Sequence, residues 1–143
     1  MLGCTINLLD ETLDEETALF YYDEYVNIIF VGIGGFIGAV LRYCVSLLPL
    51  PSVHDFPYLT LLVNVVGAFV LGCLVAWQTG HVIDPRLLLV MKVGVCGGFT
   101  TFSTFSAEAF DLFTNGKTLM AVLYVCASVV LSVCAVWLPQ RYM

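Results

Sequence analysis

The chain has 143 residues, of which 60% are hydrophobic and only 11% are charged. An ordinary soluble domain is nearer a quarter charged, so this composition excludes a water-soluble surface around a single core. The net charge of −6 comes from the first 25 residues, which hold seven of the eleven acids and no Lys or Arg, and no basic patch is left for nucleic acid to bind.

Residues 1–25 form an acidic arm that we expect to face solvent. Thr12 followed by Glu15 fits a capping box, which favours a short helix over 13–24. The arm also carries aromatic residues of the kind found at a membrane interface: Phe20, Tyr21, Tyr22 and Tyr25. A mobile tail with no special role is the alternative. Because the arm lacks the basic start of a signal peptide, we expect the first apolar segment to be a permanent helix.

Four apolar segments follow, at about 26–48, 58–77, 87–110 and 119–138. Each has about 20 residues or slightly more, the length that crosses a hydrocarbon core about 30 Å thick. Pro49 follows the first segment, Pro139 closes the fourth, and the connecting loops are short. The sequence therefore predicts an all-α integral membrane protein, in which residues 26–143 form one domain of four transmembrane helices and both termini lie on the same side.

The basic residues are divided almost evenly between the two sides of such a protein. The terminal side holds Arg86, Lys92 and Arg141, and the other side holds Arg42 and Lys117. Since Lys and Arg normally gather on the cytoplasmic side, this balance would allow insertion in both orientations and hence an antiparallel dimer. Chance also produces a weak bias in a short chain, so both interpretations stand.

The first two segments carry polar residues that need a partner in a membrane. Gly34 and Gly38 form a G-x-x-x-G pattern, which is typical of close helix contact, and Arg42 follows one turn later. Arg42 either reaches the nearby interface or lines an aqueous vestibule that attracts anions. Asn64 either bonds to another helix or offers its amide N–H groups to a passing anion.

The third segment reads GVCGGFTTFSTFS from Gly94 to Ser106. Paired glycines followed by β-branched hydroxyl residues make a poor continuous helix. We therefore expect the third helix to be broken in mid-membrane, as two half-helices joined at 97–100. Free backbone groups survive in lipid only where they are buried, line a cavity or bind an ion. An unbroken helix with closely packed small residues is the alternative.

Aromatic rings of the third segment and hydroxyl groups of the fourth segment also suit an anion pathway. Phe102 and Phe105 share a helix face, and the electropositive edges of their rings suit a small anion, although core packing is their ordinary role. In the fourth segment Tyr124, Ser128 and Ser132 form one stripe about 12 Å long, which we interpret as a hydroxyl track along a pore rather than packing serines.

Acidic and thiol groups offer less support for other chemistries. Donors outnumber negative charges on these faces, which favours an anion, but Glu108 would instead suit a proton-coupled or cation pathway. The six cysteines include no C-x-x-C pair, so a thiol-exchanging membrane enzyme is poorly supported and we expect no enzyme activity.

Taken together, these residues resemble the CrcB/Fluc family of fluoride channels over roughly residues 31–138. The resemblance rests on glycines around Arg42, on the surroundings of Asn64, and on a third, highly specific string: Gly34-Gly35-x-x-Gly38-Ala39-x-x-Arg42-Tyr43, Val63-Asn64-x-x-Gly67 with Gly72, and Gly97-Gly98-Phe99-Thr100-Thr101-Phe102-Ser103-Thr104-Phe105. The acidic arm is longer than is usual in that family, and the hydroxyl track ends at Val136.

The resemblance implies an antiparallel, dual-topology homodimer in the cell (inner or plasma) membrane, with a paralogous chain as the alternative partner. It implies a structural Na⁺ at the dimer centre, held by the backbone carbonyls of Gly97 and Thr100. It implies a fluoride pathway lined by Asn64, Phe102, Ser103, Thr104, Phe105, Tyr124, Ser128 and Ser132, with Arg42 in the vestibule and Glu108 as a carboxylate beside the pore.

The leading hypothesis is therefore a multi-pass, fluoride-selective channel through which toxic cytoplasmic fluoride leaves the cell passively. The alternative is a small proton-coupled multidrug or cation exporter, also built of four helices with dual topology, for which Glu108 is the candidate coupling residue.

Overall fold

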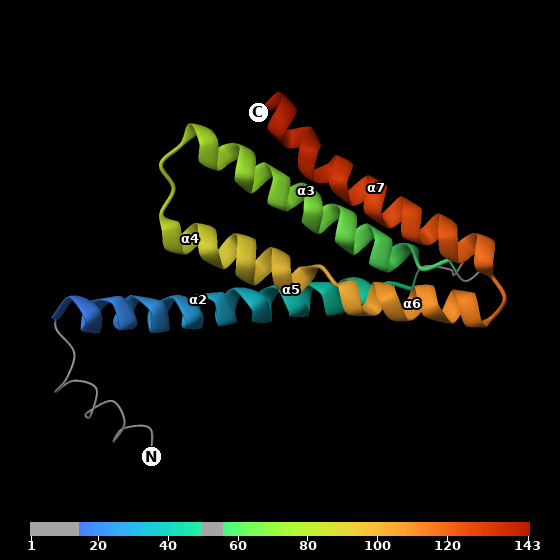
Figure 1. Ribbon diagram of the computed structural model, residues 1–143, viewed down its shortest axis with the longest axis horizontal. Coiled ribbons are helices and arrows are strands. Elements are labelled where there is room, and N and C mark those ends of the chain that lie inside the picture. Colours follow the sequence, from blue (N-terminus) through green and yellow to red (C-terminus); the bar gives the residue numbers. More distant parts are fainter. Residues whose placement is uncertain (1–14, 50–55) are drawn as a thin grey trace, which may run out of the picture.

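The computed structural model describes residues 15–49 and 56–143. The labels used from here on are those of Figure 1. The elements in chain order are α2 (Glu15–Ser46), α3 (Tyr58–Gly80), α4 (Pro85–Leu89), the π-helix η1 (Val90–Cys96), α5 (Gly97–Phe99), α6 (Phe102–Thr114) and α7 (Thr118–Tyr142). No strand occurs in these two ranges, so the described chain is all-α as predicted.

Four helical stretches among the described residues are long and apolar enough to cross a membrane: Leu19–Ser46, Tyr58–Gly80, Pro85–Thr114 and Thr118–Tyr142. They overlap the four predicted segments, which are thereby confirmed as membrane-spanning candidates, although the first stretch begins at Leu19 and not at residue 26. Pro139 lies inside α7 instead of closing it, and the helix continues to Tyr142. A proline removes one N–H donor from a helix, and transmembrane helices tolerate that loss where neighbouring groups compensate.

The described part of the acidic arm belongs to the first long helix. α2 begins at Glu15 and passes residue 26 without interruption, so residues 15–25 and the first span are one helix. The capping residue expected at Thr12 lies outside the described residues. Asp23 forms an ion pair of 2.7 Å with Arg86 in α4, which joins the arm end of α2 to the start of the third span.

The helices pack as two pairs that Figure 1 shows one above the other. α3 packs along α7, while α2 packs along η1 and α5. α6 runs on beyond α5 and packs on α7. The third span thus touches α2 with its first half and α7 with its second half, and the change of partner falls at the junction between α5 and α6.

Glycines set how closely α2 approaches the third span. A Cβ at Gly34 would lie 2.6 Å from the carbonyl oxygen of Val90, and a Cβ at Gly38 would collide with that of Val95. From the other side, a Cβ at Gly98 would lie 2.5 Å from the carbonyl oxygen of Gly35. Gly34 and Gly38 therefore make the close helix contact that their spacing indicates.

The helical conformation of the third span stops between α5 and α6. Thr100 (φ −73°, ψ 156°) and Thr101 (φ −146°, ψ 117°) are extended, whereas Gly97 is helical (φ −65°, ψ −37°). The extended residues thus follow the paired glycines that were expected to open the junction. Gly98 serves close packing instead, since it lies against the backbone of α2, whereas a Cβ at Gly97 would meet nothing within 4 Å.

Candidate functional site

Asn64 of α3 binds both backbone groups of Thr101 at the junction. The Thr101 N–H donates to Asn64 Oδ1 at 2.8 Å, and Asn64 Nδ2 donates to the Thr101 carbonyl at 3.1 Å. An extended residue inside a span leaves its N–H and C=O without helical partners, and leaving them unpaired in lipid would cost several kcal/mol. Asn64 thus provides the interhelical bond that stabilises the junction.

The Thr101 side chain caps the helix that follows. Its Oγ1 accepts a hydrogen bond from the N–H of Thr104 at 3.2 Å and lies 3.0 Å from the Thr104 hydroxyl. The Ser103 hydroxyl lies 3.4 Å away on the exposed side. A threonine N-cap satisfies one of the free N–H groups at a helix start, so Thr101 fixes where α6 begins.

Two backbone carbonyls lose their usual helical donors at the same place. The N–H of Thr101, which would bond to the Gly97 carbonyl in a helix, bonds to Asn64 instead. The N–H of Thr104, which would bond to the Thr100 carbonyl, bonds to Thr101 Oγ1 instead. The carbonyls of Gly97 and Thr100 therefore remain available as oxygen ligands.

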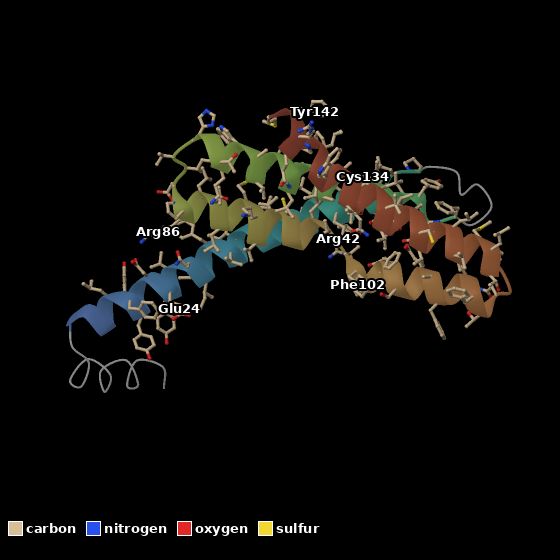
Figure 2. All side chains as sticks on the ribbon, turned by 45° about the horizontal axis from the view of Figure 1, so that its top comes forward. Glu24, Arg42, Arg86, Phe102, Cys134 and Tyr142 are labelled. Atoms are coloured by element: carbon tan, nitrogen blue, oxygen red, sulfur yellow. The ribbon has the colours of Figure 1, made fainter. Side chains whose placement is uncertain are left out.

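Arg42 approaches this junction from α2, as its label in Figure 2 shows. Its Nε donates to the carbonyl of Gly98 at 3.4 Å, and the side chain is half-buried. Arg42 also lines a cavity of about 210 Å³ with Thr60, Thr101 and Thr104. The guanidinium thus lies beside a cavity that three threonines also line, and its role in a vestibule stays a prediction.

A larger cavity of about 420 Å³ lies on the other side of Thr101. It brings together most of the predicted site residues: Asn64, Gly97, Thr100, Phe102, Phe105, Ser128 and Ser132. Three further residues of its lining were not predicted as site residues: Lys92, Cys96 and Thr101. The Ser128 hydroxyl is buried and has no hydrogen-bond partner among the described residues. No acidic side chain is among the residues that line this cavity.

Glu108 lies in a third cavity, of about 480 Å³, near the loop end of α6. Its two carboxylate oxygens accept hydrogen bonds of 2.7 Å from the hydroxyls of Thr60 and Tyr124. Tyr124 is wholly buried and packs its ring against Phe56 and Phe105, with centroid distances of 5.6 and 5.2 Å. The predicted stripe on α7 is thus divided, because Ser128 and Ser132 line the 420 Å³ cavity and Tyr124 instead binds Glu108.

The two predicted phenylalanines lie together on α6. Their ring centroids are 5.6 Å apart with an interplanar angle of 43°. Phe105 is half-buried against Tyr124, whereas Phe102 is 80% exposed at the mouth of the 420 Å³ cavity. The Phe105 ring therefore belongs to the packed interior, whereas the Phe102 ring is covered by little of the described chain.

Three residues of this region carried no signal as site residues in the sequence analysis: Thr60, Thr101 and Lys92. Thr101 and Thr60 each line two of the three cavities, and so they separate neighbouring cavities along the protein. Thr101 could have been recognised as a candidate N-cap, because threonine is among the residues preferred at that position. The roles of Thr60 and Lys92 depend on contacts between helices, which a single sequence does not display.

Residues 29–140 match the family described as CrcB-like protein, Camphor Resistance (CrcB). A fluoride-specific ion channel FluC from Methylobacterium radiotolerans is 44% identical over 115 residues, which cover 78% of this chain and 80% of that protein. The FluC proteins of Shewanella halifaxensis (41% identical, 80% and 94% covered) and Agrobacterium fabrum (44%, 78% and 91%) are similar. The family match leaves out residues 1–28, which include the acidic arm.

Proposed function

The chain belongs to the CrcB-like family, whose members named above are ion channels and not enzymes, and from this membership we propose that it conducts fluoride. It is a multi-pass membrane protein with four spans. In our proposal it is a fluoride-selective channel that lets toxic cytoplasmic fluoride leave the cell passively. The structural observation that carries the proposal is the 420 Å³ cavity, which gathers five of the eight predicted pathway residues: Asn64, Phe102, Phe105, Ser128 and Ser132.

The chemistry of that cavity suits a small, strongly hydrated anion. Such an ion crosses a membrane only if donors replace its water without holding it tightly. The unpartnered hydroxyl of Ser128, the hydroxyl of Ser132 and the second N–H of the Asn64 amide are donors of this kind. The ring edges of Phe102 and Phe105 add positive potential without a fixed charge. The absence of an acidic side chain from this lining disfavours a cation.

We also propose that the carbonyls of Gly97 and Thr100 hold a structural Na⁺. Both carbonyls have lost their helical donors, and carbonyls of unwound membrane helices are known Na⁺ ligands. When bound, the ion would supply positive charge that satisfies these free oxygens.

The same carbonyls support a functional unit of two chains. The two proposed carbonyls of one chain supply two oxygen ligands, whereas hard cations take more oxygen ligands than two. A second copy doubles the set. Gly97 is exposed and Phe102 is 80% exposed beside it, so this face is open to another chain. The nearly even distribution of Lys and Arg suits an antiparallel homodimer.

Growth of cells that lack fluoride export tests the proposal. Expression of this chain alone should restore growth in millimolar fluoride, and the Phe102→Ile variant should restore it less. Failure of the chain alone, with rescue when a paralogous chain is added, would replace the homodimer by a heterodimer. Failure in both cases, with the protein present in the membrane, would contradict fluoride export.

A further inference from the structure

Lys92 places a positive charge at the wall of the 420 Å³ cavity. It lies in the π-helix η1, is half-buried, and lines the cavity with Leu71 and Ser132. Its Nζ reaches the neutral Oε1 of Gln78 at 3.4 Å, which is a long hydrogen bond. The ion pair found within the described ranges joins Arg86 to Asp23 and does not involve Lys92. The ammonium charge is therefore not neutralised by an acidic side chain among these residues.

The charge lies at the membrane-surface end of the cavity. Helical side chains lean toward the start of their helix, so the Lys92 stem points back toward α4. Its contact Gln78 lies two residues before the end of α3 at Gly80. Asn64 and Phe105, which lie nearer the α6 end of the same cavity, are well separated from it. An anion that enters from the surface near Gly80 thus passes Lys92 before it meets Ser132 and Ser128.

We propose that Lys92 concentrates anions at this mouth of the pathway. The inference rests on the proposed channel function, and it adds Lys92 to Arg42 as a second positively charged side chain on the pathway. Arg42 lines the 210 Å³ cavity and Lys92 lines the 420 Å³ cavity. Thr101 lies between these two cavities, so the two positive charges lie on opposite sides of the junction. A like-signed field in a low-dielectric cleft raises the local concentration of counter-ions and the rate at which they enter. Because the charge lies at the surface end of the cavity, it attracts the ion without holding it beside Ser128.

The experiment measures fluoride efflux from liposomes of neutral lipid that contain the full-length protein, at two ionic strengths set by impermeant salts. The Debye length falls from about 30 Å at 0.01 M to about 3 Å at 1 M, so only the low-salt condition lets Lys92 act at a distance. Lys92→Gln should lower the initial rate by about two- to tenfold at low ionic strength, and the difference should vanish at high ionic strength. Lys92→Arg should keep the wild-type rate.

Two control variants separate attraction from a structural role. Gln78→Leu removes the contact of Lys92 and keeps its charge, so it should leave the rate and its salt dependence unchanged. Arg141→Gln removes a charge from the exposed end of α7, outside the cavity, and should lower the low-salt rate less than Lys92→Gln does.

The inference is overturned if Lys92→Gln matches the wild type at low ionic strength, if it loses flux equally at both, or if Gln78→Leu reproduces its effect. It is also overturned without any variant if wild-type efflux does not fall as ionic strength rises. An absence of wild-type fluoride flux would instead contradict the channel function itself.

Discussion

Asn64 holds the backbone of Thr101 from both directions, with its oxygen 2.8 Å from the Thr101 nitrogen and its nitrogen 3.1 Å from the Thr101 oxygen. The pair connects the second span to the one place where the third span is not helical. By taking up the Thr101 N–H, Asn64 also frees the Gly97 carbonyl. One side chain thus stabilises the junction and leaves a potential ion ligand beside it.

Replacement of Asn64 by Leu should therefore destabilise the protein, because both Thr101 backbone groups lose their partners. Each unpaired buried group costs about 1–3 kcal/mol, so for two groups we expect a loss of about 2–6 kcal/mol in the free energy of unfolding. Thermal unfolding in detergent measures it. Leu62→Ala, at an exposed site on the same helix, is the control and should change stability little. Equal melting temperatures for Asn64→Leu and wild type would show that the hydrogen bonds are dispensable.

Neighbouring glycines of α2 should respond differently to the same change. A Cβ at Gly38 meets the backbone of Val95 and Phe99, whereas a Cβ at Gly35 meets nothing within 4 Å. Gly38→Ala should cost about 1–3 kcal/mol, because the backbone of the third span must move away. Gly35→Ala should be neutral or slightly stabilising, because Ala favours a helix. Unfolding measured in the same detergent compares them, and similar losses for both variants would contradict the packing of α2 on η1 and α5.

Phe102 offers the cleaner test of the aromatic pair. Its side chain is 80% exposed, so Phe102→Ile should leave the fold of the chain intact, while Phe105→Ile also removes packing against Tyr124. Loss of one aromatic contact of about 0.5–1.5 kcal/mol should slow fluoride efflux roughly two- to tenfold or more. Efflux rates and elution on a sizing column measure flux and assembly separately. Wild-type flux in Phe102→Ile would remove this ring from the pathway.

Glu108 distinguishes a passive channel from a proton-coupled exporter. Its carboxylate accepts hydrogen bonds from the hydroxyls of Thr60 and Tyr124. A glutamine has the same size and keeps one oxygen acceptor, and its NH₂ group can donate a hydrogen bond to the other hydroxyl oxygen. In a channel, Glu108→Gln should therefore keep measurable fluoride efflux, with no dependence on a pH gradient. Efflux with and without an imposed gradient checks this. Loss of all transport, together with proton-driven cation exchange by the wild type, would favour the exporter.

The membrane-spanning segments could be predicted because hydrocarbon thickness imposes one length on every span. The close approach at Gly34 and Gly38 could also be predicted, since small residues four apart lie on one helix face. The position of the junction between α5 and α6 was harder to predict. The paired glycines attract notice as helix breakers, yet both are helical, and Gly98 lies where the backbone of α2 leaves no room for a Cβ.

Pairings between helices could not be predicted from one sequence. Tyr124 and the serines that follow it share a stripe on α7, but Glu108 on α6 provides Tyr124 with a polar partner of its own. Lys92 counted only as a charge on one side of the membrane until the fold placed it on the cavity wall. Hydrophobic patterns report which residues avoid water and not which polar groups meet.

Efflux of fluoride and chloride from one preparation of liposomes tests the central claim most directly. Both ions are loaded together, an ionophore for potassium dissipates the membrane potential, and two electrodes follow the ions after the protein has been reconstituted alone. The account predicts that fluoride leaves rapidly while chloride stays, as it does in protein-free liposomes. Release of both ions at similar rates would contradict the selectivity, and no fluoride release above that of protein-free liposomes would contradict the channel.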